Sequence, residues 1–203
     1  MINSTIQSIK GRRSVRSFEE KEIDKEQLKE IIQAGKFAPS AQNKQPWKFI
    51  VITNKDFIQD LSLEVKKELK NVLKKRFIKK FSMKELKDED TLKHIYAFAF
   101  SEKDIIFFNS PALVFIVTED NLFFDESCAC CAENMMLAAH SLGIGSCWIG
   151  FASVLGLKKE VMKKIGVPDK HHISAAIVFG YPKGKSERAP IRKVGSDVIN
   201  WIE

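Results

Sequence analysis

The pattern of apolar and polar positions predicts a few strands separated by much longer helical stretches. Short runs rich in β-branched and aromatic residues predict strands, because such side chains suit a pleated, half-buried surface. A short extended segment is also expected at "SCWIG", residues 146–150. The three clear strands are 47–53 (WKFIVIT), 111–119 (PALVFIVTE) and 171–182 (HHISAAIVFGYP).

Apolar residues at helical spacing predict the other elements. Asp24 is placed to cap a helix whose apolar face carries Leu28, Ile31 and Ile32. A later stretch, "CACCAENMMLAA", is apolar almost all round, so its helix should be central and buried. The expected helices cover about 4–10, 24–38, two or three helices within 56–108, 125–142 and 154–168.

The order of these elements predicts an α+β or α/β fold, in which the central helix packs on a small sheet. No internal repeat or low-complexity linker interrupts residues 1–203, so we expect a single domain. The tail, 183–203, has no core pattern of its own but carries Ile191, Val198, Ile199 and Trp201. Apolar residues on such a tail suggest a C-terminal arm that docks onto another surface.

Composition places the chain among soluble globular proteins, with 44% hydrophobic and 29% charged residues in 203. No apolar run approaches the length of a membrane span, and the N-terminus lacks the apolar core of a secretory signal. We therefore expect a cytoplasmic protein.

The formal net charge of +7 is concentrated in "KKELKNVLKKRFIKK", Lys66–Lys80. Leu61, Val65 and Leu69 recur at helical spacing here, with lysines on the remaining faces. A solvated basic face of an amphipathic helix is the favoured interpretation. A nucleic-acid or membrane patch is the alternative, but no known nucleic-acid motif or stacking aromatic series accompanies the lysines.

The four cysteines favour thiols that pack in the core. Cys128 and Cys131 form a CxxC pair, but the sequence offers no second pair at zinc-ligand spacing. Because the residues lie in a predicted buried helix, they can pack as small apolar side chains. We expect no metal site, and the absence of a secretory signal favours thiols over disulfides.

Arginine is rare in this chain, and most of the arginines lie near the two ends. The chain has 27 lysines and 6 arginines, yet Arg12, Arg13 and Arg16 fall within five positions, and the tail adds Arg188 and Arg192. The planar guanidinium group grips phosphate or carboxylate at two points, whereas lysine is a flexible point charge. The stretch therefore indicates an anion site, with a solvated helix end as the alternative.

Two further segments have unusual composition. The loop "PSAQNKQP", between Pro39 and Pro46, presents serine and amide groups that could contact the edge of a heterocycle. The segment "GIGSCWIG", 143–150, is rich in glycine but follows a helix, so it fails the test for a dinucleotide-binding loop. Its glycines allow close approach to another backbone or to a flat ligand.

Taken in order, these segments resemble the FMN-dependent nitroreductase family of NAD(P)H-linked flavoenzymes. The resemblance covers essentially the whole chain and rests on "RRSVRSF", "APSAQNKQPWKFIVI", "NMMLAAHSLGIGSCWIG", "VFGYP" and the basic tail. It implies an α+β fold with a small mixed or antiparallel sheet flanked by helices. It also implies a homodimer, with the C-terminal arm exchanged onto the partner subunit.

The resemblance assigns roles to the arginine stretch. Arg12 and Ser14 would hold the FMN phosphate, and Arg13 the phosphate end of the ribityl chain. Arg16 would lie near the pyrimidine edge, where a cation stabilises reduced flavin. The other implied FMN contacts are Arg188 and Arg192 from the tail; Pro39, Ser40, Ala41, Asn43 and Gln45 from the loop, reaching the partner's FMN; and Cys147, Trp148, Ile149 and Gly150 along the ring.

The resemblance implies an oxidoreductase in which NADH or NADPH reduces FMN and an electron-poor acceptor then enters the same cleft. Nitroaromatics, quinones, enones and free flavin are the acceptor candidates. No catalytic side chain is expected; a backbone N–H near Ile149 or Gly150 would face flavin N5. The alternative is an FMN-binding sensor or storage protein without significant turnover. One family contact, a polar residue between the first two strands, is left unassigned within 56–108.

Overall fold

The computed structural model describes residues 3–78, 89–184, 200 and 202, with side chains of the third helix described as far as Lys74. In this part of the chain the sheet has four strands: β1 (Lys48–Ile52), β2 (Ala112–Glu119), β3 (Gly145–Trp148) and β4 (His171–Gly180). Their order is β1-β2-β4-β3, and every neighbouring pair is antiparallel. The fold is therefore α+β, as the family resemblance implied, and β1 and β3 are its edges.

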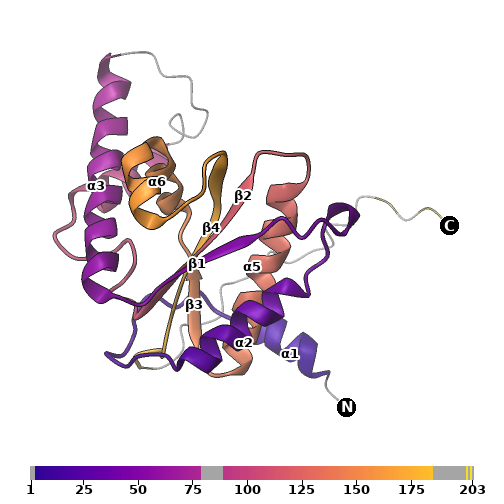
Figure 1. The fold of residues 1–203 in the computed structure, drawn as a ribbon. Helices are drawn as coiled ribbons and strands as arrows, with labels where there is room; N and C mark the ends of the chain where they lie inside the picture. The colour runs from indigo at the N-terminus through magenta and orange to yellow at the C-terminus, as the bar shows by residue number, and fades with distance from the viewer. Residues whose placement is uncertain (1–2, 79–88, 185–199, 201, 203) are drawn as a thin grey trace.

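The central strands β2 and β4 explain why the sheet can carry helices on both faces. Every residue of β2 except its last is buried. Because side chains alternate across a strand, Val114 and Ile116 face one hydrophobic cluster, whereas Leu113 and Phe115 face the other. Two cores are thus built from one strand, and helices cover both faces of the sheet (Figure 1).

One face of the sheet is covered by α2 (Lys25–Lys36) and α5 (Phe124–Ser141), with α1 (Ser4–Gly11) packed on α5. The cysteine-rich helix is central, and Cys128, Cys131 and Met135 are fully buried in it. The expectation that all its cysteines pack in the core is wrong for Cys130, which lies on an exposed face. A Cβ on Gly35 would lie 2.6 Å from Met135 Cγ, so glycine allows α2 and α5 to pack closely.

The opposite face is covered by α3 (Lys55–Ile78), α4 (Glu89–Phe100) and the 3₁₀ segment η3 (Gly150–Leu157), followed by α6 (Lys159–Ile165). Of the two or three helices expected within 56–108, the described residues contain two, α3 and α4. The single helix predicted over 154–168 is wrong: the backbone is extended at Lys158, with φ −121° and ψ 102°, which separates η3 from α6.

The predicted cap of α2 is confirmed, because the Asp24 carboxylate accepts a hydrogen bond of 2.7 Å from Glu26 N–H. The predicted C-terminal arm lies almost wholly outside the described residues. The chain just before it is fixed: Lys183 N–H donates to Ser17 O at 2.9 Å, and Glu19 N–H donates to Tyr181 O. The start of the arm therefore lies beside the segment that follows the arginines.

The described part of the chain contains no helix of the length and apolarity needed to cross a membrane.

Candidate functional site

A cavity of about 740 Å³ lies between α3, α4, η3 and the end of β3. Its walls are mainly aliphatic and aromatic, and the rings of Phe98 on α4 and Phe151 on η3 meet at a centroid distance of 4.9 Å. This volume is within the range of small-molecule sites, which are typically about 300–1,000 Å³. The lining residues are Arg16, Leu69, Val72, Thr91, Ile95, Phe98, Ile106, Phe108, Cys147, Trp148, Ile149, Gly150, Phe151, Ser153, Val154 and Leu157.

The structure brings together at this cavity two predicted segments that are distant in sequence. Arg16 lines it together with Cys147, Trp148, Ile149 and Gly150. A Cβ built on Gly150 meets no atom within 4 Å, so the backbone there is open to a ligand.

The backbone distinguishes the two amides proposed to face flavin N5. Ile149 N–H already donates to Ala176 O of β4, at 2.8 Å. Gly150 N–H lies at the start of η3, where helix geometry supplies no partner for the first donors. Gly150 is therefore the better candidate of the two.

The arginine stretch, Arg12–Arg16, lies along the edge strand β3. Ser14 forms a parallel bridge with Ser146, and Val15 N–H donates to Ser146 O at 2.9 Å. Gly145 makes this approach possible, because a Cβ there would lie 2.8 Å from Val15 Cβ. The fit between this glycine and Val15 fixes where the arginines stand relative to the cavity.

Arg12 and Arg13 are partly buried and place a group of donors next to this bridge. Arg13 Nη1 donates to the carbonyl oxygens of Lys10, Gly11 and Arg12, at 2.7, 3.1 and 2.8 Å, and so caps the end of α1. Arg12 Nε lies 3.3 Å from Glu133 Oε1, an ion pair without hydrogen-bond geometry. The buried Nε atoms of both arginines have no hydrogen-bond partner among the described residues. Such a donor set suits the oxygens of an anion.

The predicted loop contacts do not line the cavity of their own chain. The loop is instead fixed on α5, since Ala41 N–H donates to Ser127 Oγ at 3.2 Å, and closed by Gln45 N–H, which donates to Ser40 Oγ at 3.0 Å. Asn43 and Gln45 have positive φ, 55° and 48°, a conformation that non-glycine residues seldom adopt. Pro39 precedes this loop. Of the other predicted contacts, Arg188 and Arg192 lie outside the described residues.

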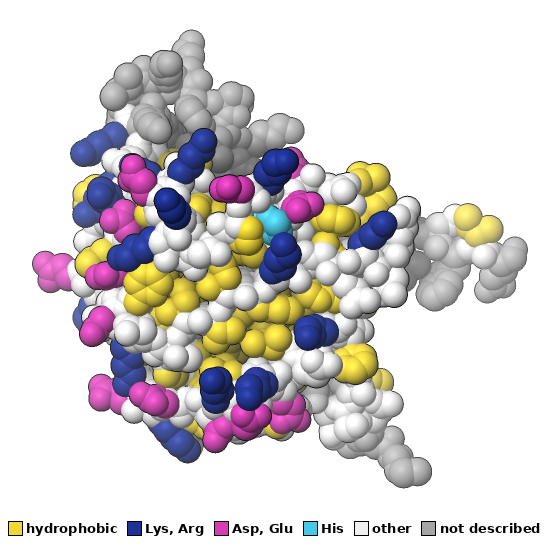
Figure 2. Space-filling model, viewed as in Figure 1, with side chains coloured by type: hydrophobic (Ala, Val, Ile, Leu, Met, Phe, Trp, Pro, Cys, Tyr) yellow, Lys and Arg dark blue, Asp and Glu magenta, His cyan; other side chains and the backbone are white. Residues whose placement is uncertain are grey.

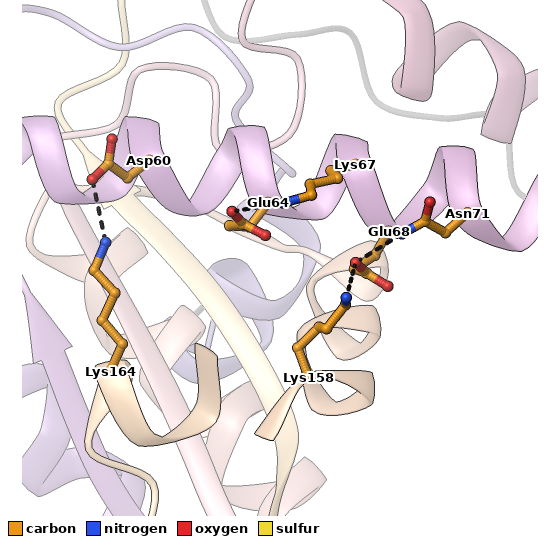
Figure 3. A network of polar contacts seen from close by, with 7 residues as sticks. All are labelled: Asp60, Glu64, Lys67, Glu68, Asn71, Lys158 and Lys164. Atoms are coloured by element: carbon orange, nitrogen blue, oxygen red, sulfur yellow. Dashed lines mark hydrogen bonds and ion pairs between the residues drawn. The ribbon is translucent and has the colours of Figure 1, made fainter. Parts of the chain in front are cut away.

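An ionic network anchors the wall formed by η3 (Figure 3). Glu68 of α3 is almost completely buried, and its carboxylate accepts from Asn71 Nδ2 at 3.0 Å and pairs with Lys158 Nζ at 3.4 Å. A second pair, Asp60 with Lys164 at 3.4 Å, links α3 to α6. A buried carboxylate that loses its partner is costly, so the Glu68–Lys158 pair holds the end of η3 against α3. Both members of the Asp60–Lys164 pair are exposed, so that pair contributes little.

Part of the basic stretch of α3 is structural. Lys66 Nζ donates to Ser101 O and Lys103 O at the end of α4, and Lys67 pairs with Glu64 at 3.7 Å. These contacts reduce the charge available to an external polyanion, within the portion of Lys66–Lys80 whose side chains are described.

A polar cluster joins the start of α5 to β4 on the other side of the sheet. His172 Nε2 lies 2.9 Å from Asp125 Oδ1. Burial raises the pKa of Asp125, but hydrogen bonds from Ser174 and His172 and the charge on His172 outweigh it, so the pKa lies below its ordinary value of 3.8. Burial also raises the pKa of the Cys128 thiol to about 11. The cluster fixes α5 and lies apart from the cavity lining.

Sequence reasoning missed the walls contributed by residues 56–108. Leu69, Val72, Ile95, Ile106 and Phe108 line the cavity, but in the sequence they are indistinguishable from core residues. Val72 lies within the same apolar stripe as Val65 and Leu69, so helical spacing alone does not mark it as a cavity residue.

Comparisons with known proteins agree with this geometry. The family model described as "Nitroreductase family" matches residues 9–181. The chain belongs to the nitroreductase family. A nitroreductase with bound FMN from Bacteroides fragilis is 30% identical, with a TM-score of 0.77 over 98% of this chain and 99% of that one. A nitroreductase with bound FMN from Desulfitobacterium hafniense, at 24% identity and full coverage of both chains, has the same fold with a TM-score of 0.77.

A sequence relative from Archaeoglobus fulgidus is 25% identical over 188 residues, which is 90% of this chain and 87% of its own. Its provisional name is NADH dehydrogenase/NAD(P)H nitroreductase.

The described residues contain no group of three or more histidine, cysteine or acidic side chains that could hold a metal ion.

Proposed function

We propose that this nitroreductase-family chain is an FMN-dependent oxidoreductase that passes hydride from NADH or NADPH to a neutral, electron-poor acceptor. The observation that carries the proposal is that Arg16 and residues 147–150, the segments expected to contact flavin, line one apolar cavity. The solved relative from Bacteroides fragilis contains FMN, which supports the same cofactor here. When bound, FMN supplies the atom that accepts and delivers hydride.

The residues present suit FMN. Arg12, Arg13 and Ser14 would bind the phosphate end, where two buried arginine Nε atoms have no hydrogen-bond partner among the described residues. Arg16 would place a positive charge by the pyrimidine edge and stabilise the charge that develops on reduction. Gly150 leaves room for close approach of a flat ring.

The cavity walls indicate which acceptors are suitable. Arg16 is the only charged side chain among the described residues that line the cavity. Excluding water from such a site protects hydride transfer and favours neutral apolar molecules. Quinones, nitroaromatics and enones therefore suit it better than free flavin mononucleotide, whose phosphate would need a cation of its own.

A homodimer is the proposed working form. The strand β1 is an edge of the sheet, and its Val51 is 42% exposed. Figure 2 shows apolar side chains gathered across the centre of the face that carries β1, inside a rim of charged ones. An open edge and an exposed apolar patch are both features that a partner covers. In the dimer, Ser40, Asn43 and Gln45 would contact the FMN of the other subunit.

Anaerobic rapid mixing of the purified yellow protein with NADH or NADPH tests the activity. Bleaching of the flavin absorbance, followed by its return on adding 1,4-naphthoquinone, is the expected result. A protein that binds FMN but is reduced by neither nucleotide supports the sensor or storage alternative. A colourless protein that does not bind added FMN refutes both proposals.

A further inference from the structure

The connection between α4 and β2, residues 101–110, is held in place by the carboxylate of Asp104, which accepts four hydrogen bonds. Asp104 Oδ1 accepts hydrogen bonds from Ile106 N–H and Phe107 N–H, both at 3.0 Å, and Oδ2 accepts from Asn109 N–H at 2.8 Å. Ser62 Oγ of α3 donates to the same Oδ1 at 2.7 Å. Three backbone amides and one hydroxyl are therefore organised around one side chain.

A buried lysine fixes the beginning of the same connection. Lys66 is 7% exposed, and its Nζ donates to Ser101 O at 3.1 Å and to Lys103 O at 2.8 Å. These carbonyls follow the C-terminal end of α4, where a positive charge is favourable. The connection is thus fastened to α3 at two places, by Lys66 and through Ser62.

The backbone held in this way is strained at two consecutive non-glycine residues. Phe108 has φ 58° and Asn109 has φ 49°, both in the left-handed region. This is uncommon for asparagine and a clear outlier for a bulky aromatic residue. Such conformations persist only where the surroundings impose them, and they cluster at functional sites.

Because of this strain, two neighbouring aromatic side chains lie in different environments. Phe107 is fully buried in the core beneath the sheet, whereas Phe108 is only partly buried and lines the cavity with Ile106. Phe107 fills the core, and Phe108 packs against the margin of the same core. The feature that the strain provides is a ring held at a fixed place in the cavity wall.

We propose that Phe108 determines which electron acceptors fit, by limiting the bulk of the molecule beside the flavin, and that Asp104 is its positioning residue. The inference rests on the proposed oxidoreductase function. The Phe108 ring is carried by a strained turn that four hydrogen bonds to Asp104 hold in place, so it cannot move aside as a flexible surface side chain does. Phe108 therefore favours compact over extended aromatic acceptors.

The test compares 1,4-benzoquinone with 9,10-phenanthrenequinone as oxidants of holoprotein whose flavin has been reduced anaerobically by light, with EDTA as the sacrificial electron donor. Phe108→Ala should raise the ratio of the phenanthrenequinone rate constant to the benzoquinone rate constant about tenfold, and Phe108→Leu about threefold, since pocket volume discriminates by such factors. Asp104→Asn should raise it too, because the ring loses its fixed position. The dissociation constant of phenanthrenequinone from oxidised holoprotein, measured by fluorescence quenching, should fall in parallel.

Phe100→Ala is the matched control. Phe100 lies on the last turn of α4 but is 62% exposed and outside the cavity, so its removal should leave the ratio within about twofold. If both Phe108 variants bind FMN and keep the wild-type ratio, the inference is overturned. Because EDTA and light reduce the flavin without a nicotinamide, failure of NADH and NADPH as donors would contradict the proposed function while the ratio could still be measured.

Discussion

Replacing Gly145 by alanine should weaken FMN binding, because it moves the arginine stretch away from β3. The added Cβ would lie 2.8 Å from both Cβ and Cγ2 of Val15, about 0.6 Å short of the 3.4 Å at which ordinary contact begins. Val15 Cβ is fixed to its backbone, so no change of rotamer removes the clash. The backbone of one segment has to shift.

The structure sets the size of the effect. A shift of that size would lengthen the bond between Val15 N–H and Ser146 O from 2.9 Å to about 3.5 Å. Overpacking costs about 1–3 kcal/mol and a lost hydrogen bond about 1 kcal/mol, so we expect destabilisation of about 2 kcal/mol. Displaced arginines should raise the dissociation constant of FMN about tenfold, equivalent to about 1.4 kcal/mol.

Urea denaturation and titration with FMN, followed by fluorescence quenching, measure the two quantities. Gly156→Ala is the control, because a Cβ there meets no atom within 4 Å and its φ is not positive. Val15→Gly in the Gly145→Ala background should recover FMN affinity, since it removes every atom in the clash. Wild-type midpoint and FMN affinity in Gly145→Ala alone would refute the reasoning.

Three further predictions concern charge and exposure. Arg12→Ala should weaken FMN binding about ten- to hundredfold, whereas Arg16→Ala should mainly lower the flavin midpoint potential; equal loss of FMN with no change in potential would contradict this division. Asp125→Asn should destabilise the protein at about pH 5 and progressively less below about pH 4. The reason is that the stability contributed by a carboxylate of lowered pKa is lost as pH falls through that pKa. A difference in urea midpoint that does not change with pH would contradict the role of His172. Cys130→Ser should abolish the fast reaction with a disulfide reagent, since Cys130 is exposed and the other three cysteines are buried; a fast thiol remaining in the variant would show otherwise.

The sequence alone determined most of the elements and the family. Strands such as 111–119 and the buried helix around Cys131 were predictable, because alternation and helical spacing are local consequences of which side chains leave water. The arginine stretch and the segment 147–150 were identified as one site through the resemblance to a family. No local rule in the sequence connects Arg16 with Gly150.

Tertiary structure alone decided which apolar residues face the cavity and what holds them there. Phe107 and Phe108 are identical neighbours in the sequence, yet one is in the core and the other lines the cavity. The difference follows from backbone dihedrals imposed by Asp104, whose own position depends on Ser62 in a different helix. The break at Lys158 was also missed, and the contact that Lys158 makes there, an ion pair with Glu68, joins residues 90 positions apart. Hydrophobic periodicity records burial and contains no information about such long-range polar contacts.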